Sequence, residues 1–220
     1  MIDFSLIIPG GWAHIPTTPG LAQLRARSIK AIVRQALPDT LPRDKAGPWR
    51  RLLRKELTEA TDEAERHGAR GLVIPVQEMH GMRLPGSLLL SVIEDAADGP
   101  DPMQVLSEIV ADAGPDGMAL EVGGCPAARV YKIIDSDSIR YDEPSVRVSY
   151  LVAAPEEAPG VWGALTFTVL SGGDVEADHV QAVVLLFDAV VSTLRWTEVV
   201  NPPTENDLLA ESSAGGKPLA

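Results

Sequence analysis

Hydrophobic residues recur with two different periods along this chain of 220 residues, and the changes of period predict where helices and strands lie. Apolar residues return every three or four positions over 19–37, 44–68 and 174–196, which predicts three amphipathic helices. A fourth, short helix is predicted after Asp101 and Pro102, because aspartate caps a helix and proline is tolerated at its first position. The pattern therefore predicts about four helices.

The predicted helix ends and buried faces follow from the same pattern. Thr18 and Asp174 are expected to cap the first and the last helix, and the last helix should end at Trp196 and cover the sheet. In the second helix, one buried stripe is predicted. Its members share three- and four-residue spacings: Trp49, Leu52, Leu53, Leu57, Ala60 and Ala64.

Elsewhere the period falls to two, which indicates strands. The clearest strand is 146–152, where the even-numbered residues Val146, Val148, Tyr150 and Val152 are apolar or aromatic, as a sheet with one covered face requires. Two short strands are expected around the Pro9–Gly11 turn. Three further hairpins are predicted at 72–77 with 84–93, 118–122 with 127–134, and 146–152 with 162–170.

These elements predict an α+β fold. It should contain an antiparallel β-sheet of about six to eight strands covered by a C-terminal helix, with a helical pair inserted at 19–67 after the first hairpin. Residues 1–200 are expected to form a single domain. Residues 201–220 offer little apolar surface to offset the entropy of ordering, so a disordered tail is expected there.

Composition and charge exclude several classes of protein. The net charge of −12 disfavours nucleic acid as a partner, because affinity for phosphates comes mainly from lysine and arginine. The charge is unevenly distributed, with a net of +5 over 25–70 and −16 over 71–220. Neither a signal peptide nor a run of about 20 apolar residues is apparent, and Cys125 is the only cysteine. A soluble, cytoplasmic protein without a membrane partner is therefore expected.

The residue types that carry chemistry are scattered. The four histidines show no metal-ligand spacing, so no metal and no cofactor is predicted. Ser87 and Cys125 follow glycine-containing turns but lack the sequence of a nucleophile elbow, and Cys125 is interpreted as a small buried residue. No catalytic residue is assigned. An enzyme of unrecognised type would need a converging pair such as His80 with Glu78.

Two surfaces are candidates for binding. The first is the basic run of the second helix, Arg50, Arg51, Arg54 and Lys55, whose position opposes the helix dipole because acidic residues follow it. It is either a solvated helix face or a docking patch for an acidic protein, including a second copy of the chain. The alternative function is binding of a small molecule or peptide. Its cleft would lie near Trp12, His14 and His80.

The N-terminal motif carries a family resemblance. The pattern Phe4-x-Leu6-x-Ile8-Pro9-x-Gly11-Trp12-x-x-Ile15-Pro16, together with a long meander and a closing helix ending Leu194-Arg-Trp196, resembles a superfamily with three known groups. These are the Ran-binding Mog protein, the photosystem II extrinsic P subunit (PsbP) and Lpq-type actinobacterial lipoproteins. The helical pair at 19–67 and the missing lipid-accepting cysteine depart from that pattern.

The resemblance implies a fold and a type of function. Members of that superfamily commonly act by binding other proteins, which implies an interaction or accessory role. The composition also resembles actinobacterial proteins associated with type VII secretion. The leading hypothesis is a non-catalytic, cytosolic protein-interaction or accessory module, with a possible link to a secretion system.

Overall fold

The computed structural model describes residues 2–38, 40–78, 81, 84–96, 99–135, 143–199 and 204–214. Within these ranges the chain forms strands, α-helices and one short 3₁₀ helix. In chain order the elements are β1 (Ile2–Ser5), β2 (Trp12–Pro16), α1 (Ala22–Ala36), α2 (Arg43–Arg66), β3 (Ala69–Pro75), β4 (Gly86–Glu94), α3 (Pro102–Ala113), η1 (Gly114–Asp116), β5 (Gly117–Val122), β6 (Cys125–Ile134), β7 (Ser145–Ala153), β8 (Val161–Leu170), α4 (Asp178–Ser192), β9 (Arg195–Glu198) and α5 (Glu205–Ala214).

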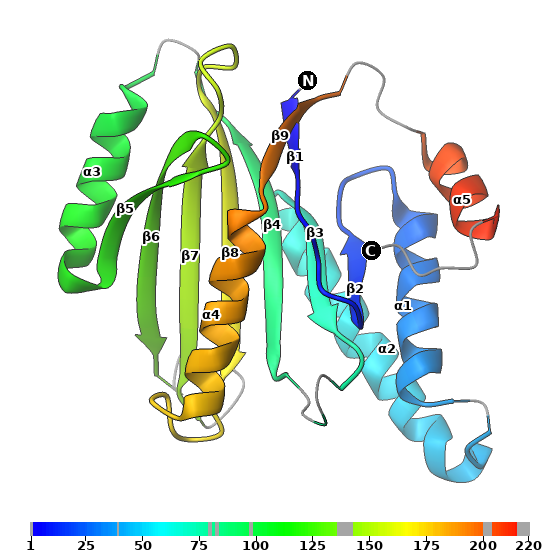
Figure 1. The fold of residues 1–220 in the computed structure, drawn as a ribbon. Helices are drawn as coiled ribbons and strands as arrows, with labels where there is room; N and C mark the ends of the chain where they lie inside the picture. Colours follow the sequence, from blue (N-terminus) through cyan, green and yellow to red (C-terminus); the bar gives the residue numbers. More distant parts are fainter. Residues whose placement is uncertain are drawn as a thin grey trace.

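Seven strands form one antiparallel sheet in the order β2-β3-β4-β8-β7-β6-β5 (Figure 1). The three predicted hairpins β3–β4, β5–β6 and β7–β8 are confirmed by their pairing. The long connection from β4 through α3 to β5 carries the chain across to the far edge. The predicted α+β class, the antiparallel sheet and the C-terminal helix are thereby confirmed.

Helix α4 covers one face of this sheet (Figure 1). The predicted alternation in β7 is confirmed, because Val146, Val148, Tyr150 and Val152 are all buried on this face. The ring of Phe167 in β8 stacks on Phe187 of α4, with ring centroids 4.5 Å apart. This apolar face explains why α4 is the main lid, since a helix with a wide apolar stripe gains most by covering a sheet.

The opposite face carries the remaining sheet-packed helices at its two ends. Helices α1 and α2 pack over β2 and β3, with Ile15, Ile29 and Leu57 in their shared core. Helix α3 packs over β5 and β6, where Leu106 meets Ala128. The predicted helical pair is therefore present and belongs to the second layer, behind the sheet in the view of Figure 1.

The prediction of a first hairpin is wrong. Strand β1 pairs with β9, where Phe4 lies opposite Trp196, and β2 pairs with β3 instead. The Phe4 and Trp196 rings contact each other edge to face, and both fit against β8 because Gly163 has no side chain. Burial of two aromatic rings on β8 outweighs what a short local hairpin can gain.

The expected caps of α1 and α4 are also corrected. Helix α1 begins at Ala22, and the Thr18 hydroxyl donates to the carbonyl of Arg70 on β3 instead of capping α1. Helix α4 begins at Asp178, while Asp174 accepts the amide of Glu176 in the preceding turn. In both places the side chain forms a hydrogen bond with a different nearby backbone group, as short polar side chains commonly do.

The end of the chain differs from the expected disordered tail, because Glu205–Ala214 form helix α5. The Glu205 carboxylate accepts the free amides of Gln23 (2.7 Å) and Leu24 (3.1 Å) at the start of α1. A carboxylate at a helix N-terminus satisfies unpaired amides and complements the helix dipole. A residue about 180 positions away in sequence therefore supplies the capping that Thr18 was expected to provide. Helix α4 also stops at Ser192, so that Trp196 belongs to β9.

Candidate functional site

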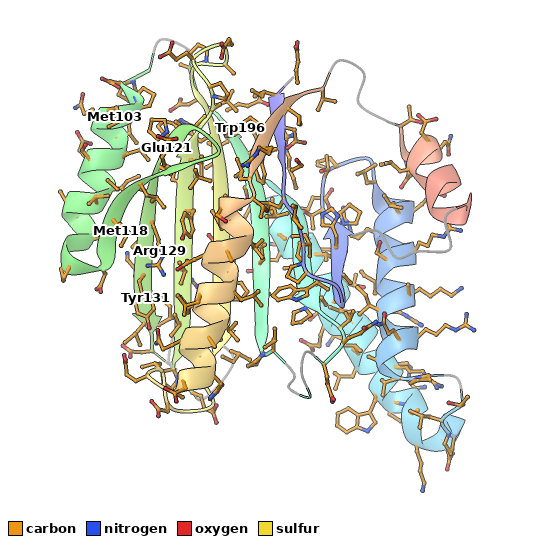
Figure 2. All side chains as sticks on the ribbon, in the orientation of Figure 1. Met103, Met118, Glu121, Arg129, Tyr131 and Trp196 are labelled. Atoms are coloured by element: carbon orange, nitrogen blue, oxygen red, sulfur yellow. The ribbon has the colours of Figure 1, made fainter. Side chains whose placement is uncertain are left out.

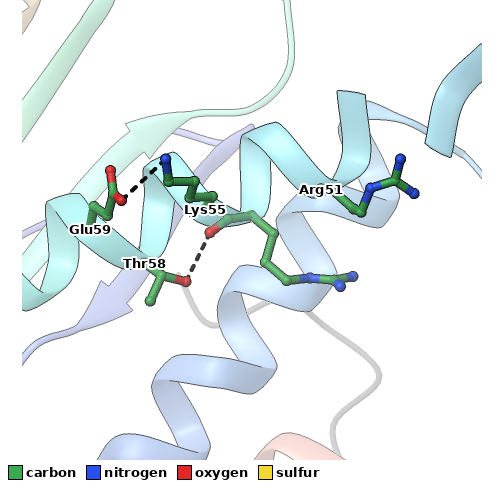
Figure 3. A pocket seen from close by; sticks show the side chains of 5 residues that line it. Arg51, Lys55, Thr58 and Glu59 are labelled. Atoms are coloured by element: carbon green, nitrogen blue, oxygen red, sulfur yellow. Dashed lines mark hydrogen bonds and ion pairs between the residues drawn. The ribbon is translucent and has the colours of Figure 1, made fainter. Parts of the chain in front are cut away.

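The outward face of α2 carries a shallow basic hollow, lined by Arg51, Arg54, Lys55, Thr58 and Glu59 and about 380 Å³ in volume (Figure 3). We call these five residues the basic hollow. Their spacing of three and four positions places them on one stripe of the helix. This stripe lies away from the buried residues Ala46, Leu57, Thr61 and Ala64, which face the sheet and α1.

Two of the cations in the basic hollow form no ion pair with any residue that the structure describes. Lys55 forms an ion pair with Glu59 at 3.6 Å, and the Thr58 hydroxyl donates to the Arg54 carbonyl at 2.8 Å. The guanidinium groups of Arg51 and Arg54 are exposed, and in the described part of the chain neither forms an ion pair. These two side chains are therefore available to a partner.

Three other arginines, Arg25, Arg70 and Arg129, are held by carboxylates. Arg25 binds Asp62 at 3.0 Å and Glu65 at 2.8 Å, and its pKa is raised chiefly by the hydrogen bond to Glu65. Arg70 binds Asp3 at 3.1 Å. Arg129 binds Asp188 at 3.1 Å. The basic hollow differs from these places because its arginines stand free on a chain with more acids than bases.

The structure separates Arg50 from the other three predicted docking residues. Its side chain donates to the carbonyls of Leu37 and Pro38, at the end of α1. These carbonyls lack helical partners of their own, so Arg50 ties α2 to the α1 terminus. We therefore assign Arg50 a positioning role beside the surface formed by Arg51, Arg54 and Lys55.

Exposed apolar side chains accompany the basic hollow. Trp49 is 63% exposed and Leu52 is 46% exposed, and Leu41 in the preceding turn is 41% exposed. The predicted burial of Trp49, Leu52 and Ala60 is wrong, because α2 packs mainly on α1 and β3 and its buried stripe is narrower than the apolar pattern. A spacing pattern cannot tell a buried tryptophan from one at the margin of the stripe.

The three residues predicted to line a ligand cleft, Trp12, His14 and His80, are not brought together by the described structure. Trp12 is buried in the core, with its ring 6.2 Å from that of Phe167. His14 is partly buried beside Gly71, and burial lowers its pKa. His80 lies outside the described residues. Neither Trp12 nor His14 lines any of the hollows described in this subsection.

A polar cluster joins α4 to the sheet. Asp188 accepts Arg129 through Nε and Nη2, both at 3.1 Å, and accepts the Tyr150 hydroxyl at 2.8 Å. Burial, followed by the hydrogen bond to Asp188, raises the pKa of Tyr150. A phenol held protonated and an arginine held in an ion pair favour a structural role for this cluster. Sequence spacing gave no sign of it, because its members lie on three elements.

Two further hollows lie near the end of β4. One is about 260 Å³ and is lined partly by Ile93, Leu151 and Trp162. The other is about 460 Å³ and carries Glu94, Glu157 and Glu198. Among the residues that the structure describes, no three His, Cys, Asp or Glu side chains are placed to hold a metal ion.

The single cysteine is buried, as predicted. Desolvation raises the pKa of the Cys125 thiol, and the nearby carboxylates of Glu121 and Glu157 raise it further. The thiolate is the reactive form of cysteine, so this environment lowers its reactivity.

The fold and the basic hollow define an α+β protein with a seven-stranded antiparallel sheet and a charged helical surface. No protein-family model matches the chain, and no curated protein has a matching sequence. Solved structures similar to it include that of LpqN, which is involved in cell envelope biogenesis of Mycobacterium tuberculosis. LpqN shares 12% sequence identity with a TM-score of 0.46, and the match covers 90% of this chain and 85% of LpqN.

A protein of Bacteroides thetaiotaomicron VPI-5482 is also similar, at 12% identity and a TM-score of 0.38. That match covers 61% of this chain and 40% of the other. Both are similarities of fold. The expected relationship with Lpq-type proteins, Mog and PsbP stays a prediction. In the described ranges, no helix combines the length and apolar character needed to cross a membrane.

Proposed function

We propose that this chain is a protein-interaction module that docks an acidic partner on the basic hollow of α2. The observation that carries the proposal is that Arg51 and Arg54 are exposed and form no ion pair within the described residues, on a chain with 31 acidic and 19 basic residues. With so many carboxylates available, an arginine without an intramolecular ion pair is a group left free for another molecule.

The physical chemistry of the hollow suits an acidic protein surface. Arginine presents a planar fork of donors that pairs with a carboxylate through two parallel hydrogen bonds. Charges on an exposed rim mainly raise the association rate and fix orientation. Nearby Trp49 and Leu52 supply the apolar contact that such a charged rim lacks, and tryptophan and arginine are the residues that most often dominate binding energy.

The alternative interpretation, a solvated helix face with internal ion pairs, accounts for only part of the surface. Lys55 and Glu59 fit it, since they form an i,i+4 pair. Arg51 and Arg54 do not, because no carboxylate in the described part of the chain binds them.

The test compares two triple variants of equal charge. The docking variant is Arg51→Glu/Arg54→Glu/Lys55→Glu, and the matched control reverses three exposed bases on other elements, Lys30, Lys132 and Arg147. Both change the net charge by the same amount. Each chain is used as bait in native lysate at low and high salt, with captured proteins identified by mass spectrometry.

We expect at least one acidic protein to be captured by the wild-type chain and by the control variant and lost from the docking variant. Its capture should also weaken at high salt, because exposed charges are screened. If the docking variant retains every protein that the wild-type chain captures, the basic hollow is not the docking surface.

A further inference from the structure

Strand β5 forms an open edge of the seven-stranded sheet. It is the last strand in the sheet order. Within the described residues, the N–H of Gly117 donates to the carbonyl of Gly114 in η1, and no backbone hydrogen bond joins residues 118–122 to an element other than β6. Met118 is 55% exposed, and Ala119 and Glu121 are exposed as well. In Figure 1, no strand lies beyond β5 on that side of the sheet.

The turn that follows β5 decides which of its backbone groups are free. Gly123 and Gly124 form a two-residue turn, so Val122 and Cys125 make the first hydrogen-bonded pair of the hairpin. Pairing then alternates, so that Ala119 and Glu121 point their N–H and C=O groups away from β6. Gly117 also lies at an outward position, but its N–H is bonded to the carbonyl of Gly114. The position of Pro126 agrees with this assignment, because it lies opposite Glu121 and has no N–H to donate.

The two edges of the sheet are unlike each other. Trp12, Ile15 and Pro16 of edge strand β2 are buried, and α1 packs against it. Helix α3 also packs against β5, closely at Gly117, but Met118, Ala119 and Glu121 remain exposed. Strand β5 carries no proline and no lysine, the residues that commonly prevent pairing at an exposed edge. The β5 edge is therefore the one that can accept another strand.

Side chains next to this edge favour apolar contact on the α4 side. Met118 and Leu120 point to the same side as Arg129 and Tyr131 of β6, since residues that lie opposite each other in a pair share a face. Figure 2 shows Met118, Arg129 and Tyr131 together on β5 and β6, with Glu121 further along β5. An added strand would place every second side chain over Met118 and Leu120.

Charge identifies the kind of strand that fits. Residues 84–128, which include α3 and β5, contain eight acidic residues and no lysine, arginine or histidine. A second copy would bring two such segments side by side, and like charges at an interface are costly. A basic segment would complement them instead.

We infer that the β5 edge binds an extended, basic segment of another protein by strand addition. The main chain of the segment would pair antiparallel with Ala119 and Glu121. Alternate apolar side chains would pack on Met118 and Leu120, and basic side chains would lie near Glu121. Strand addition takes affinity from the main chain and specificity from alternate side chains. The β5 edge is distinct from the basic hollow. The inference about β5 therefore does not depend on the proposed docking of an acidic partner at the basic hollow.

The experiment uses an eight-residue peptide of alternating lysine and valine, four of each, with blocked ends and a fluorescent label. Two isomers of it carry backbone N-methyl groups either on the lysines or on the valines, so that charge and mass are the same. In the antiparallel alignment with valine over Met118 and Leu120, the lysine amides face β5 and the valine amides face away. Fluorescence anisotropy measures the affinity of each peptide for the whole chain.

We expect the lysine-methylated isomer to bind at least tenfold more weakly than the valine-methylated isomer. In the chain, Ala119→Pro should weaken the unmodified peptide at least tenfold, because it removes an outward N–H without breaking a β5–β6 hydrogen bond. Glu121→Gln should weaken it a few-fold and reduce its salt dependence. Peptide binding should also slow hydrogen exchange at the amides of Ala119 and Glu121.

Equal binding of the two methylated isomers would overturn the inference, since charge alone would then account for the affinity. The absence of binding by the unmodified peptide at about 1 mM would overturn it as well. Self-association of the wild-type chain that Ala119→Pro abolishes, without peptide binding, would make a second copy the occupant and reject the proposed partner. If Ala119→Pro fails to fold, the pair of methylated isomers decides the outcome with the unmodified chain.

Discussion

Replacement of Asp188 by alanine tests whether the polar cluster holds α4 on the sheet. Asp188 accepts three hydrogen bonds, two from Arg129 and one from Tyr150. Its loss leaves the Arg129 guanidinium without its carboxylate and the Tyr150 hydroxyl without its acceptor. The Arg129 side chain is 15% exposed and that of Asp188 is 29% exposed, so water can replace only part of these contacts.

The expected cost lies between two limits. Exposed ion pairs contribute about 0–1 kcal/mol, whereas breaking one partner of a fully buried pair costs about 3–5 kcal/mol. The partial exposure places the Arg129–Asp188 pair between these limits, and the unpaired Tyr150 hydroxyl adds about 1 kcal/mol. We therefore expect Asp188→Ala to lower the free energy of unfolding by about 2–3 kcal/mol.

Equilibrium urea unfolding, followed by far-ultraviolet circular dichroism, measures this cost. With a urea dependence of about 1–3 kcal/mol per molar for a small protein, the midpoint should fall by about 1 M. Arg129→Met together with Asp188→Ala should cost at least about 1 kcal/mol less than the sum of the single changes, because no charge is left unpaired. Asp112→Ala, at an exposed position of α3, is the control and should change stability by less than about 0.5 kcal/mol. A cost of Asp188→Ala as small as that of the control, or additive single changes, would refute the reasoning.

Two further predictions concern His14 and its neighbour Gly71. Gly71→Ala would place a Cβ atom 2.2 Å from His14 Nε2, so it should lower the free energy of unfolding by about 1–3 kcal/mol. Adding His14→Ala to this variant should restore part of the loss. Gly10→Ala is the control and should leave stability unchanged, because its Cβ would meet no atom within 4 Å. Urea midpoints of the four variants check this, and equal costs at Gly71 and Gly10 would contradict it. Burial lowers the folded-state pKa of His14 from 6.5, so the unfolded chain binds the proton more readily and stability should be complete above pH 6.5 and decline below it. Urea unfolding at pH 8 and at pH 5.5 measures how much stability each chain loses between the two conditions. This loss should be smaller for His14→Gln than for the wild-type chain, and an equal loss would show that His14 is not responsible.

Sequence periodicity was informative wherever a whole element faces one environment. The alternation in 146–152 and the apolar stripe of α4 each predicted which side chains are buried, because every second residue of a strand and every third or fourth residue of a helix share a face. Three of the four predicted hairpins were also confirmed, because neighbouring strands commonly pair, but the hairpin around Pro9–Gly11 was not. The α+β class followed from these elements together.

The candidate site was predictable only in part. The basic run on α2 was visible in the sequence, and its charge required no structure to recognise. The structure was needed to show that Arg50 binds the end of α1, while Arg51 and Arg54 stay unpaired. It was also needed to show that Trp49 is exposed, since exposure depends on how much of α2 the sheet and α1 cover.

By itself, the sequence determined the type and approximate position of most elements, the separation of basic and acidic segments, and the lack of a familiar catalytic motif. Only the tertiary structure decided that β1 pairs with β9, that Glu205 caps α1, and that β5 is the open edge. The physical reason is that local propensity and periodicity act over a few residues. Pairing, capping from a distance and exposure depend instead on which surfaces the whole chain brings together.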